Sequence, residues 1–266
     1  MSNDKAFADR ATVDVPSDEP KVRKIGIHDL IDVLAKGFDD FKAKPSHLVL
    51  CVMIYPVVVF VIAKIDAGHE ILPLIWPLFS GVALVGPLLA MGLYEMSRRR
   101  EQGLEVSLKD GFRVLRSPSL GAILILSLVM IAIFLAWLRT ALAIYDWVFS
   151  GGEAVEIGDF IQQVLYTAKG TELIIIGTAV GFGFAVMVLC LSAVSFPLLL
   201  DRKVGALTAA KTSVRVVLAN PVTMAVWGII IAALLLVGSL PLFVGLAVAI
   251  PVLGHSTWHL YRKTVE

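Results

Sequence analysis

The sequence predicts an all-α, polytopic membrane protein with six transmembrane helices and with both termini in the cytoplasm. Three observations predict it: the composition, a series of long apolar runs, and an uneven distribution of Lys and Arg. Of the 266 residues, 58% are hydrophobic and 17% are charged, and the mean hydropathy is +0.84. Soluble domains are less apolar than this. The apolar composition therefore makes the lipid bilayer the expected surrounding. The net charge of +1 gives no indication of a nucleic-acid partner.

The chain is expected to begin with a disordered cytoplasmic tail over residues 1–24, because residues 1–20 are polar and hold no apolar stretch of the kind that a signal peptide requires. The transmembrane domain is expected over residues 25–263. A helix needs about 20 apolar residues to cross the hydrocarbon core. Six runs approach or exceed that length, and they span residues 46–63, 71–96, 118–138, 173–200, 221–237 and 241–260.

The orientation follows from the basic residues. Twenty of the 23 Lys and Arg residues lie in the N-terminal segment, the second and fourth connections and the C-terminus. Lys64 and Lys169 lie on the other side, and Arg139 is near the outer end of the third run. Because Lys and Arg accumulate on the cytoplasmic side, this division places both termini inside and requires an even number of spans.

Amphipathic segments precede three of the six runs, and each ends at a proline. They span residues 27–45, 107–118 and 206–221. Helical spacing of their apolar residues predicts interfacial helices on the inner leaflet. The recurrence predicts a three-fold internal repeat of one interfacial helix and one transmembrane hairpin. The alternative is that basic amphipathic connections are simply common on the cytoplasmic side.

The third amphipathic segment shows the expected pattern in detail. Leu207, Val214 and Leu218 are expected on one face, opposite Lys211 and Arg215. A further amphipathic helix, capped by Asp159, is expected on the outer leaflet within the segment between the third and fourth runs.

Two histidines are the candidates for a ligand site. His255 and His259 are four residues apart, so both could face one side of a helix and share a metal or a haem iron. The alternative is a structural cluster with Trp258 at the membrane interface. No third ligand has a matching spacing, so neither a metal site, a cofactor nor a catalytic residue is predicted, and these two positions stay weak candidates.

Small residues predict where helices pack closely. Gly177, Gly181 and Ala185 recur every four residues in the fourth run, and Gly86 and Ala90 form a second pair in the second run. Such faces let the backbones of two helices approach each other in lipid.

Aromatic and basic residues at the ends of the runs are expected to anchor the protein at the two membrane interfaces. At the outer end these are Trp137 and Arg139, and at the inner end they are Trp258, Arg98, Arg99 and Arg100. Glu95 is expected to pair with one of these arginines within its own helix.

Three stretches resemble a bacterial integral-membrane family, the domain-of-unknown-function family 2189. They are GPLLAMGLYEMSRRRE from Gly86, FPLLLDRKVGALTA from Phe196 and SVRVVLANP from Ser213. The similarity extends over roughly 25–263 and implies a bacterial cytoplasmic-membrane protein, without an assigned reaction. Some members are described as cytochrome c oxidase subunit I. This sequence lacks the deep histidines that an oxidase core needs for its haems and copper, so that catalytic role is rejected.

Two classes of function remain from the sequence. The first is a non-catalytic accessory or scaffold component that packs against a membrane-protein partner or a second copy of itself. The second is a carrier or channel for a small or lipidic molecule. The spans hold few ionisable groups with which to bind cargo, and they carry small-residue faces, so the first class is favoured.

Overall fold

The structure is a computed structural model, and it describes residues 19–44, 72–150, 157–240 and 244–266. The described residues form helices and no named strand; their one β-bridge joins Val22 to Val265. The predicted all-α class is confirmed. The expected first span at 46–63 lies outside the described residues, as do residues 1–18 of the expected tail.

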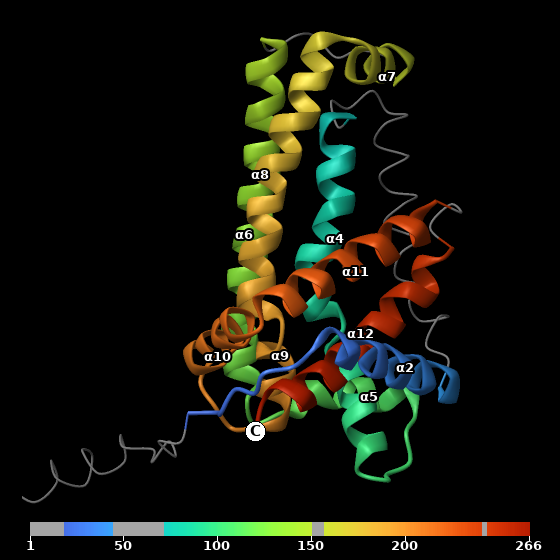
Figure 1. Cartoon of the computed structure of the whole chain (residues 1–266), viewed down its shortest axis with the longest axis vertical. Helices are drawn as coiled ribbons and strands as arrows, with labels where there is room; N and C mark the ends of the chain where they lie inside the picture. The colour runs from blue at the N-terminus through green and yellow to red at the C-terminus, as the bar shows by residue number, and fades with distance from the viewer. Residues whose placement is uncertain (1–18, 45–71, 151–156, 241–243) are drawn as a thin grey trace, which may run out of the picture.

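Three helices run side by side along the long axis of the molecule (Figure 1), and we call them the upright helices. They are α4 (Ile75–Leu89), α6 (Leu120–Phe149) and α8 (Ala168–Ser192). A short 3₁₀ turn, η1 (Leu72–Leu74), precedes α4. The side chain of Thr167 caps α8 by accepting a hydrogen bond from the Gly170 N–H at 3.0 Å, which satisfies one of the free amides of the first turn.

The remaining helices, apart from α7, gather at one end of the upright helices or lead away from it (Figure 1). We call this end the base. The base consists of α2 (Ile27–Ala43), α5 (Met91–Glu101), η2 (Leu108–Arg116), α9 (Ser195–Asp201), α10 (Ala206–Ala219) and α12 (Leu246–Thr264). The chain leaves the base along the oblique helix α11 (Pro221–Ser239) and comes back to it along α12.

The two ends of the described chain meet at the base. The Arg23 N–H donates to the Thr264 carbonyl at 2.8 Å, and the Glu266 N–H donates to the Lys21 carbonyl at 2.9 Å. Residues 19–24, which were expected to belong to a disordered tail, therefore lie along the C-terminus as part of the folded base.

The far end of the molecule carries α7 (Ile157–Tyr166), which lies beside the top of α8 (Figure 1). Phe160 of α7 packs against a small apolar cluster of Tyr145, Val148 and Phe149. The expected helix is present, but it begins at Ile157, so Asp159 lies in its first turn and does not cap it as predicted. Its contact with the outer leaflet stays a prediction.

Three segments of the described chain are long and apolar enough to cross a membrane. They are Leu120–Phe149, Ala168–Asp201 and Pro221–Ser239, which correspond to the third, fourth and fifth expected spans. The expected second span is divided at Ala90 into α4 and α5, close to Pro87, whose ring disfavours a continuous helix. The expected sixth span overlaps α12. A total of six crossings stays a prediction.

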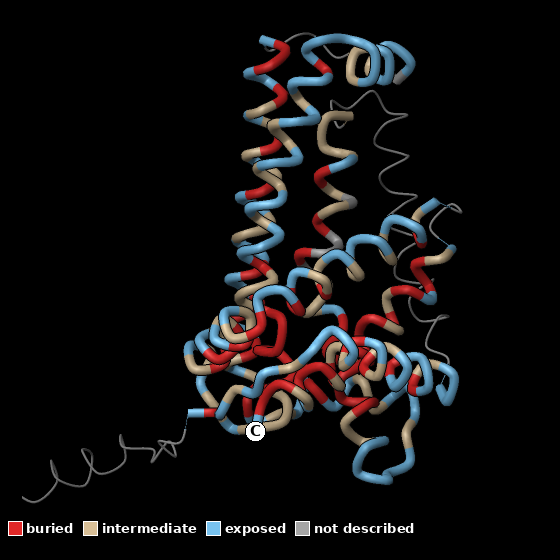
Figure 2. Tube along the Cα trace, viewed as in Figure 1, coloured by how far each residue is buried: buried red, intermediate tan, exposed pale blue. Residues whose placement is uncertain are grey.

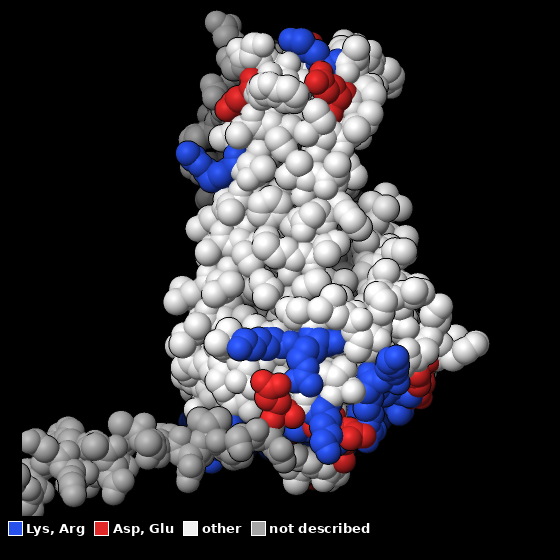
Figure 3. Space-filling view, turned by 60° about the vertical axis from the view of Figure 1, so that its left-hand side comes forward, with Lys and Arg blue, Asp and Glu red and all other residues white. Residues whose placement is uncertain are grey.

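Burial is concentrated at the base (Figure 2). Phe196, Leu198, Leu199, Leu260 and Tyr261 are fully buried there. By contrast, the upright helices expose large apolar side chains such as Leu128 (66%) and Phe182 (69%). On the face shown in Figure 3, a broad uncharged band separates the Lys and Arg residues of the base from a smaller charged group at the far end. Such a band suits a hydrocarbon surrounding.

The three amphipathic segments are all helical: α2, η2 and α10. The structure corrects the expected arrangement of α10, however. Leu207 and Leu218 are exposed on the same side as Lys211 and Arg215, because positions four, eight and eleven residues apart lie on one helical face. The face that packs against α8 and α9 consists of small residues: Ala209, Thr212, Ser213 and Val216. Interfacial placement and the three-fold repeat stay predictions.

Candidate functional site

Five polar side chains from three helices meet inside the base. We call them the Asp40 cluster: Asp40 from α2, Ser97 and Arg100 from α5, and His255 and His259 from α12. Asp40, Ser97 and His255 are 7%, 1% and 1% exposed. A buried carboxylate is costly unless it is paired and hydrogen-bonded, so this group is the strongest candidate for a functional site.

Helix α2 positions the carboxylate. Its buried residues Leu30, Val33, Gly37 and Asp40 lie on one face, and that face packs along α12. Gly37 permits the close approach, because a Cβ atom there would lie 2.0 Å from the Ser256 Oγ and 2.7 Å from the Ser256 backbone N. The missing side chain at Gly37 thus brings Asp40 within reach of α12.

The histidines lie one helical turn apart on α12, and Ser97 and Arg100 lie one turn apart on α5. Gly254 helps α5 and α12 to meet, since a Cβ there would lie 2.6 Å from the Leu93 Cδ1 and 3.3 Å from the Ala90 Cβ. Ser97, Arg100 and His259 contact the Asp40 carboxylate directly, and His255 reaches it through Ser97. The two histidines thus lie on one side of α12, as their spacing allowed.

The hydrogen bonds form a chain through Asp40. The Ser97 hydroxyl lies 2.6 Å from the Asp40 Oδ2 and 2.8 Å from the His255 Nδ1. The His259 Nε2 lies 2.9 Å from the same Oδ2, and the Arg100 Nη1 donates to Oδ1. The carboxylate is thus held on both oxygens by three different side chains.

The pKa of Asp40 reflects these contacts. Burial alone would raise the pKa of this carboxyl, but hydrogen bonds from His259, Ser97 and Arg100 outweigh burial and hold the pKa below its ordinary value. Asp40 is therefore ionised at neutral pH, and Arg100 offsets its charge across a partly exposed ion pair.

The order of the hydrogen bonds argues against a nucleophilic serine. In a Ser-His-Asp triad the histidine accepts the serine proton and the carboxylate binds the far side of the histidine. Here the carboxylate contacts Ser97 directly. Because a hydroxyl has one proton, a Ser97 that donates to Asp40 must accept from His255 Nδ1. Such a serine is held in place rather than activated.

Two buried polar atoms of α12 lack a hydrogen-bond partner among the described residues: His255 Nε2 and Ser256 Oγ. His255 belongs to the Asp40 cluster, and Ser256 is the next residue along α12. Within the described part of the chain, no group of three or more His, Cys, Asp or Glu residues is arranged to hold a metal ion. His259 contacts Asp40 directly and His255 contacts it through Ser97, and no cofactor is assigned to them.

A second polar layer ties α12 to the neighbouring helices. The Trp258 indole donates to Glu101 at 2.9 Å, and Arg262 donates to the other oxygen of the same carboxylate at 2.9 Å. The Tyr261 hydroxyl donates to Asp201 at 2.7 Å. Trp258, an expected interface anchor, is thus 1% exposed and contacts protein. Its depth in the membrane stays a prediction.

The other expected anchors have different surroundings. The Trp137 indole is buried and donates to the Pro77 carbonyl and the Ser80 hydroxyl, both at 3.1 Å. Arg139 is exposed on α6, and an anchoring role for both stays a prediction.

The three arginines of α5 also differ from one another. Arg98 binds both oxygens of the buried Glu95, at 2.7 and 2.9 Å, which confirms the expected ion pair. Arg99 lies 3.7 Å from Asp110 of η2, and Arg100 joins the Asp40 cluster. All three thus form ion pairs with carboxylates of the base, and an anchoring role for them stays a prediction.

The small residues of α8 face different neighbours. A Cβ at Gly181 would lie 3.0 Å from the Trp137 ring, so this glycine lets α6 and α8 approach. A Cβ at Gly177 would meet nothing within 4 Å, and Ala185 is exposed. Gly86 is likewise open, whereas Ala90 is buried near Gly254. Packing against another protein through the open positions stays a prediction.

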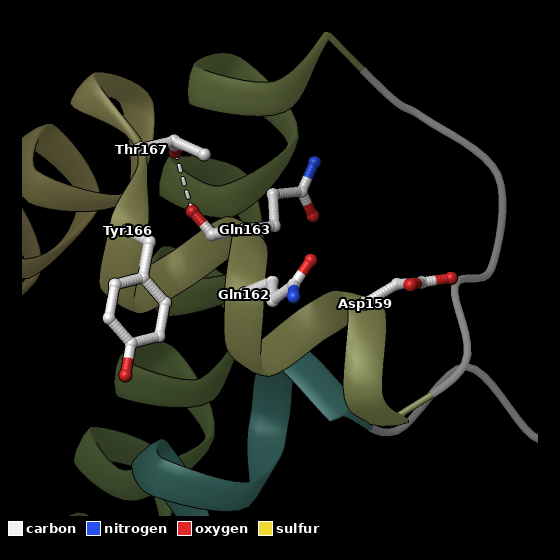
Figure 4. A pocket seen from close by; sticks show the side chains of 5 residues that line it. All are labelled: Asp159, Gln162, Gln163, Tyr166 and Thr167. Atoms are coloured by element: carbon white, nitrogen blue, oxygen red, sulfur yellow. Dashed lines mark hydrogen bonds between the residues drawn. The ribbon is translucent and has the colours of Figure 1, made fainter.

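A polar hollow of about 580 Å³ lies beside α7 at the far end. Its lining residues are Asp159, Gln162, Gln163, Tyr166 and Thr167. Figure 4 shows that the Asp159 and Tyr166 side chains point away from each other. The one hydrogen bond drawn joins the Thr167 hydroxyl to the Gln163 carbonyl at 2.5 Å. These groups do not converge on one ligand atom, so the Asp40 cluster is the stronger site.

Sequence reasoning missed Asp40, Ser97 and the link to Arg100. Asp40 lies 57 residues from Ser97 and 219 from His259, and no local spacing signals such a contact. The available signal was an acidic residue on the apolar face of α2, three residues beyond Gly37. A charged residue in that position needs a buried partner.

No curated protein and no solved structure matches this chain. One family model does match, over residues 75–201. That range includes α4, α5, α6 and α8, and thus two of the three candidate spans, together with Ser97 and Arg100 of the Asp40 cluster. Residues 75–201 are thus similar to the family described as predicted integral membrane protein (DUF2189), which confirms the resemblance over this range. The chain is an integral membrane protein with several apolar helices.

Proposed function

We propose that this protein is a non-catalytic accessory or scaffold component of the bacterial inner membrane, which packs against a membrane-protein partner through α8. The observation that carries the proposal is the exposure of this helix. Only 6% of the apolar window of Ala168–Asp201 is buried, compared with 28% and 22% for the other two candidate spans. Helix α8 thus offers most of its surface to lipid or to another protein.

The small residues of α8 make a protein neighbour the better explanation. Gly177 has open space where a Cβ would lie, and Ala179, Gly183 and Ala185 are exposed. Lipid chains gain little from small residues, whereas a second helix can approach them closely and gain dispersion contacts. Gly181 already serves this purpose within the chain, against Trp137.

The proposed topology has six spans and both termini in the cytoplasm. The meeting of Val22 with Val265 supports it, because chain ends that touch belong on one side of the membrane. The gathering of Arg98, Arg99 and Arg100 with Arg202 and Arg262 in the base supports the cytoplasmic assignment of that side. In this arrangement α7 lies at the outer surface.

The test is affinity purification in mild detergent of the full chain and of a Gly177→Leu variant. The added side chain meets open space within the chain, so the fold should persist while contact with a partner is lost. Val186→Leu, an exposed position on the same helix, is the matched control. We expect a stoichiometric membrane partner with the parent chain and the control, and its loss with Gly177→Leu. Repeated recovery of the chain alone would remove the proposal.

The second candidate, a carrier for a small or lipidic molecule, is favoured by one observation: the buried ionised Asp40 with its two histidines. A carrier needs ionisable groups to bind cargo or protons. The cluster lies in the base rather than midway along the upright helices, so the accessory role is the better supported of the two. Proton-coupled uptake into vesicles that contain the purified chain would favour the carrier.

A further inference from the structure

Helix α10 is held at the membrane boundary by its connections. Four residues separate it from the candidate span that ends at Asp201, and one residue separates it from the span that begins at Pro221. A helix joined so closely to a span at each end must lie where the hydrocarbon ends. This placement rests on the proposed topology, which puts α10 at the inner leaflet.

A groove of about 350 Å³ lies between α10 and the inner end of α8. Four apolar residues line it: Leu191 of α8, and Leu207, Ala210 and Val214 of α10. Leu207 is 69% exposed. An apolar groove that is open to its surroundings at the level of the membrane is suited to a hydrocarbon chain rather than to water.

Two cations, Lys211 and Arg215, and the Glu19 carboxylate complete the lining of the same groove. Lys211 is exposed and makes no hydrogen bond or ion pair with any described residue. Arg215, one turn further along, donates to the Glu19 carboxylate at 2.8 Å, and both partners are exposed. Exposed ion pairs contribute little free energy, so an anion that reaches Lys211 can also compete for Arg215.

We propose that this groove binds an anionic phospholipid of the inner leaflet, with an acyl chain against Leu191, Leu207 and Val214 and the phosphate between Lys211 and Arg215. The combination of an apolar groove and adjacent cations matches the two parts of such a lipid. A zwitterionic lipid would bring its own cation beside Lys211 and lose that advantage.

The test is native mass spectrometry of the full chain, released from micelles that contain equal amounts of phosphatidylglycerol and phosphatidylcholine. The parent chain should retain phosphatidylglycerol preferentially. Lys211→Gln should weaken that retention about fivefold, and the double variant Lys211→Gln/Arg215→Gln roughly 25-fold. These factors correspond to about 1 kcal/mol of attraction between each cation and the anionic headgroup. Ala210→Leu, which fills the groove without changing charge, should also reduce retention.

The matched control is Lys109→Gln/Arg116→Gln on η2, which removes two exposed cations of the same side that make no ion pair with described residues. Equal loss in this control would mean a general charge effect and would overturn the proposal. Equal retention of the two lipids by the parent chain would also overturn it. So would the finding that a polypeptide copurifies with the parent chain and is lost from the Lys211→Gln/Arg215→Gln variant. The Gly177→Leu variant should still retain phosphatidylglycerol. Partner binding and lipid binding are therefore tested independently of each other.

Discussion

At the scale of single residues, Asp40 shows how a buried charge is tolerated in this base. Its carboxylate is held by side chains from two other helices, and its low pKa keeps it ionised. Asparagine at this position would keep one acceptor oxygen but lose the charge, and its NH2 group would face donors among Arg100, His259 and Ser97. The cost therefore extends to three partners, of which Ser97 is buried.

We expect Asp40→Asn to lower the free energy of unfolding by about 3 kcal/mol, because the buried group loses its charge and one of its two acceptor oxygens. Unfolding in detergent, followed by tryptophan fluorescence, would measure this. The adjacent Asp39 is the control, since it forms only an exposed pair with Lys42 at 2.8 Å, and Asp39→Asn should cost no more than about 0.5 kcal/mol. Equal effects of the two variants would contradict the structural account of Asp40.

The residue scale also shows where prediction from sequence stops. His255 and His259 were recognisable as a pair because the α-helical period is local. Asp40, the partner of His259, was not recognisable, because it lies 219 residues earlier in the chain and only the folded base brings the two together. Trp137 illustrates the same limit, since its partner is a backbone carbonyl of Pro77.

At the scale of elements, long apolar runs identified α6, α8 and α11 correctly, since hydrocarbon solvation requires little more than length and composition. The division of the second run into α4 and α5 was not predicted. The amphipathic helices were located correctly, but the buried face of α10 was not, because its small residues Ala209, Thr212 and Ser213 carry no strong apolar signal.

The pairing of α2 with α12 is expected to depend on pH through Lys263, which contacts Asp29 at 2.8 Å and Asp32 at 3.0 Å. Hydrogen bonds from Lys263 lower the pKa of both carboxyls, and those carboxyls raise the pKa of Lys263. Lowered carboxyl pKa values add stability that is present above the ordinary value of 3.8 and is lost as pH falls through the folded values. A raised lysine pKa adds stability that is lost only as pH rises through its folded value, above 10.5.

The protection factors of the amides at the start of α2, which are corrected for the intrinsic pH dependence of exchange, should therefore stay constant from about pH 5 to about pH 9. They should fall below about pH 4, where the carboxyls become protonated. Lys263→Gln should reduce protection at neutral pH and flatten the acid response. Lys36→Gln, which removes the more exposed partner of Asp32, is the comparison. An unchanged acid response in Lys263→Gln would show that this contact does not hold α2.

At the scale of the whole molecule, the base and α7 are expected on opposite sides of the membrane. In a background with Cys51 and Cys190 replaced by Ser, a cysteine at Lys169 should react with an impermeant maleimide in intact spheroplasts. A cysteine at Lys109 should react only after lysis. Both positions are exposed, so the difference would report sidedness. Reaction of Lys109→Cys before lysis would show that the base faces outward and would contradict the proposed orientation.

The contact between α2 and α12 also bears on how the protein is made. The ribosome completes α12 after every other described helix, so the face of α2 that carries Val33, Gly37 and Asp40 remains uncovered while the intervening helices are inserted. An interrupted nascent chain would keep that face bare, with its acidic group unmatched. The base is thus expected to close only after α12 has left the ribosome, so its assembly follows the insertion of the spans that lie between α2 and α12.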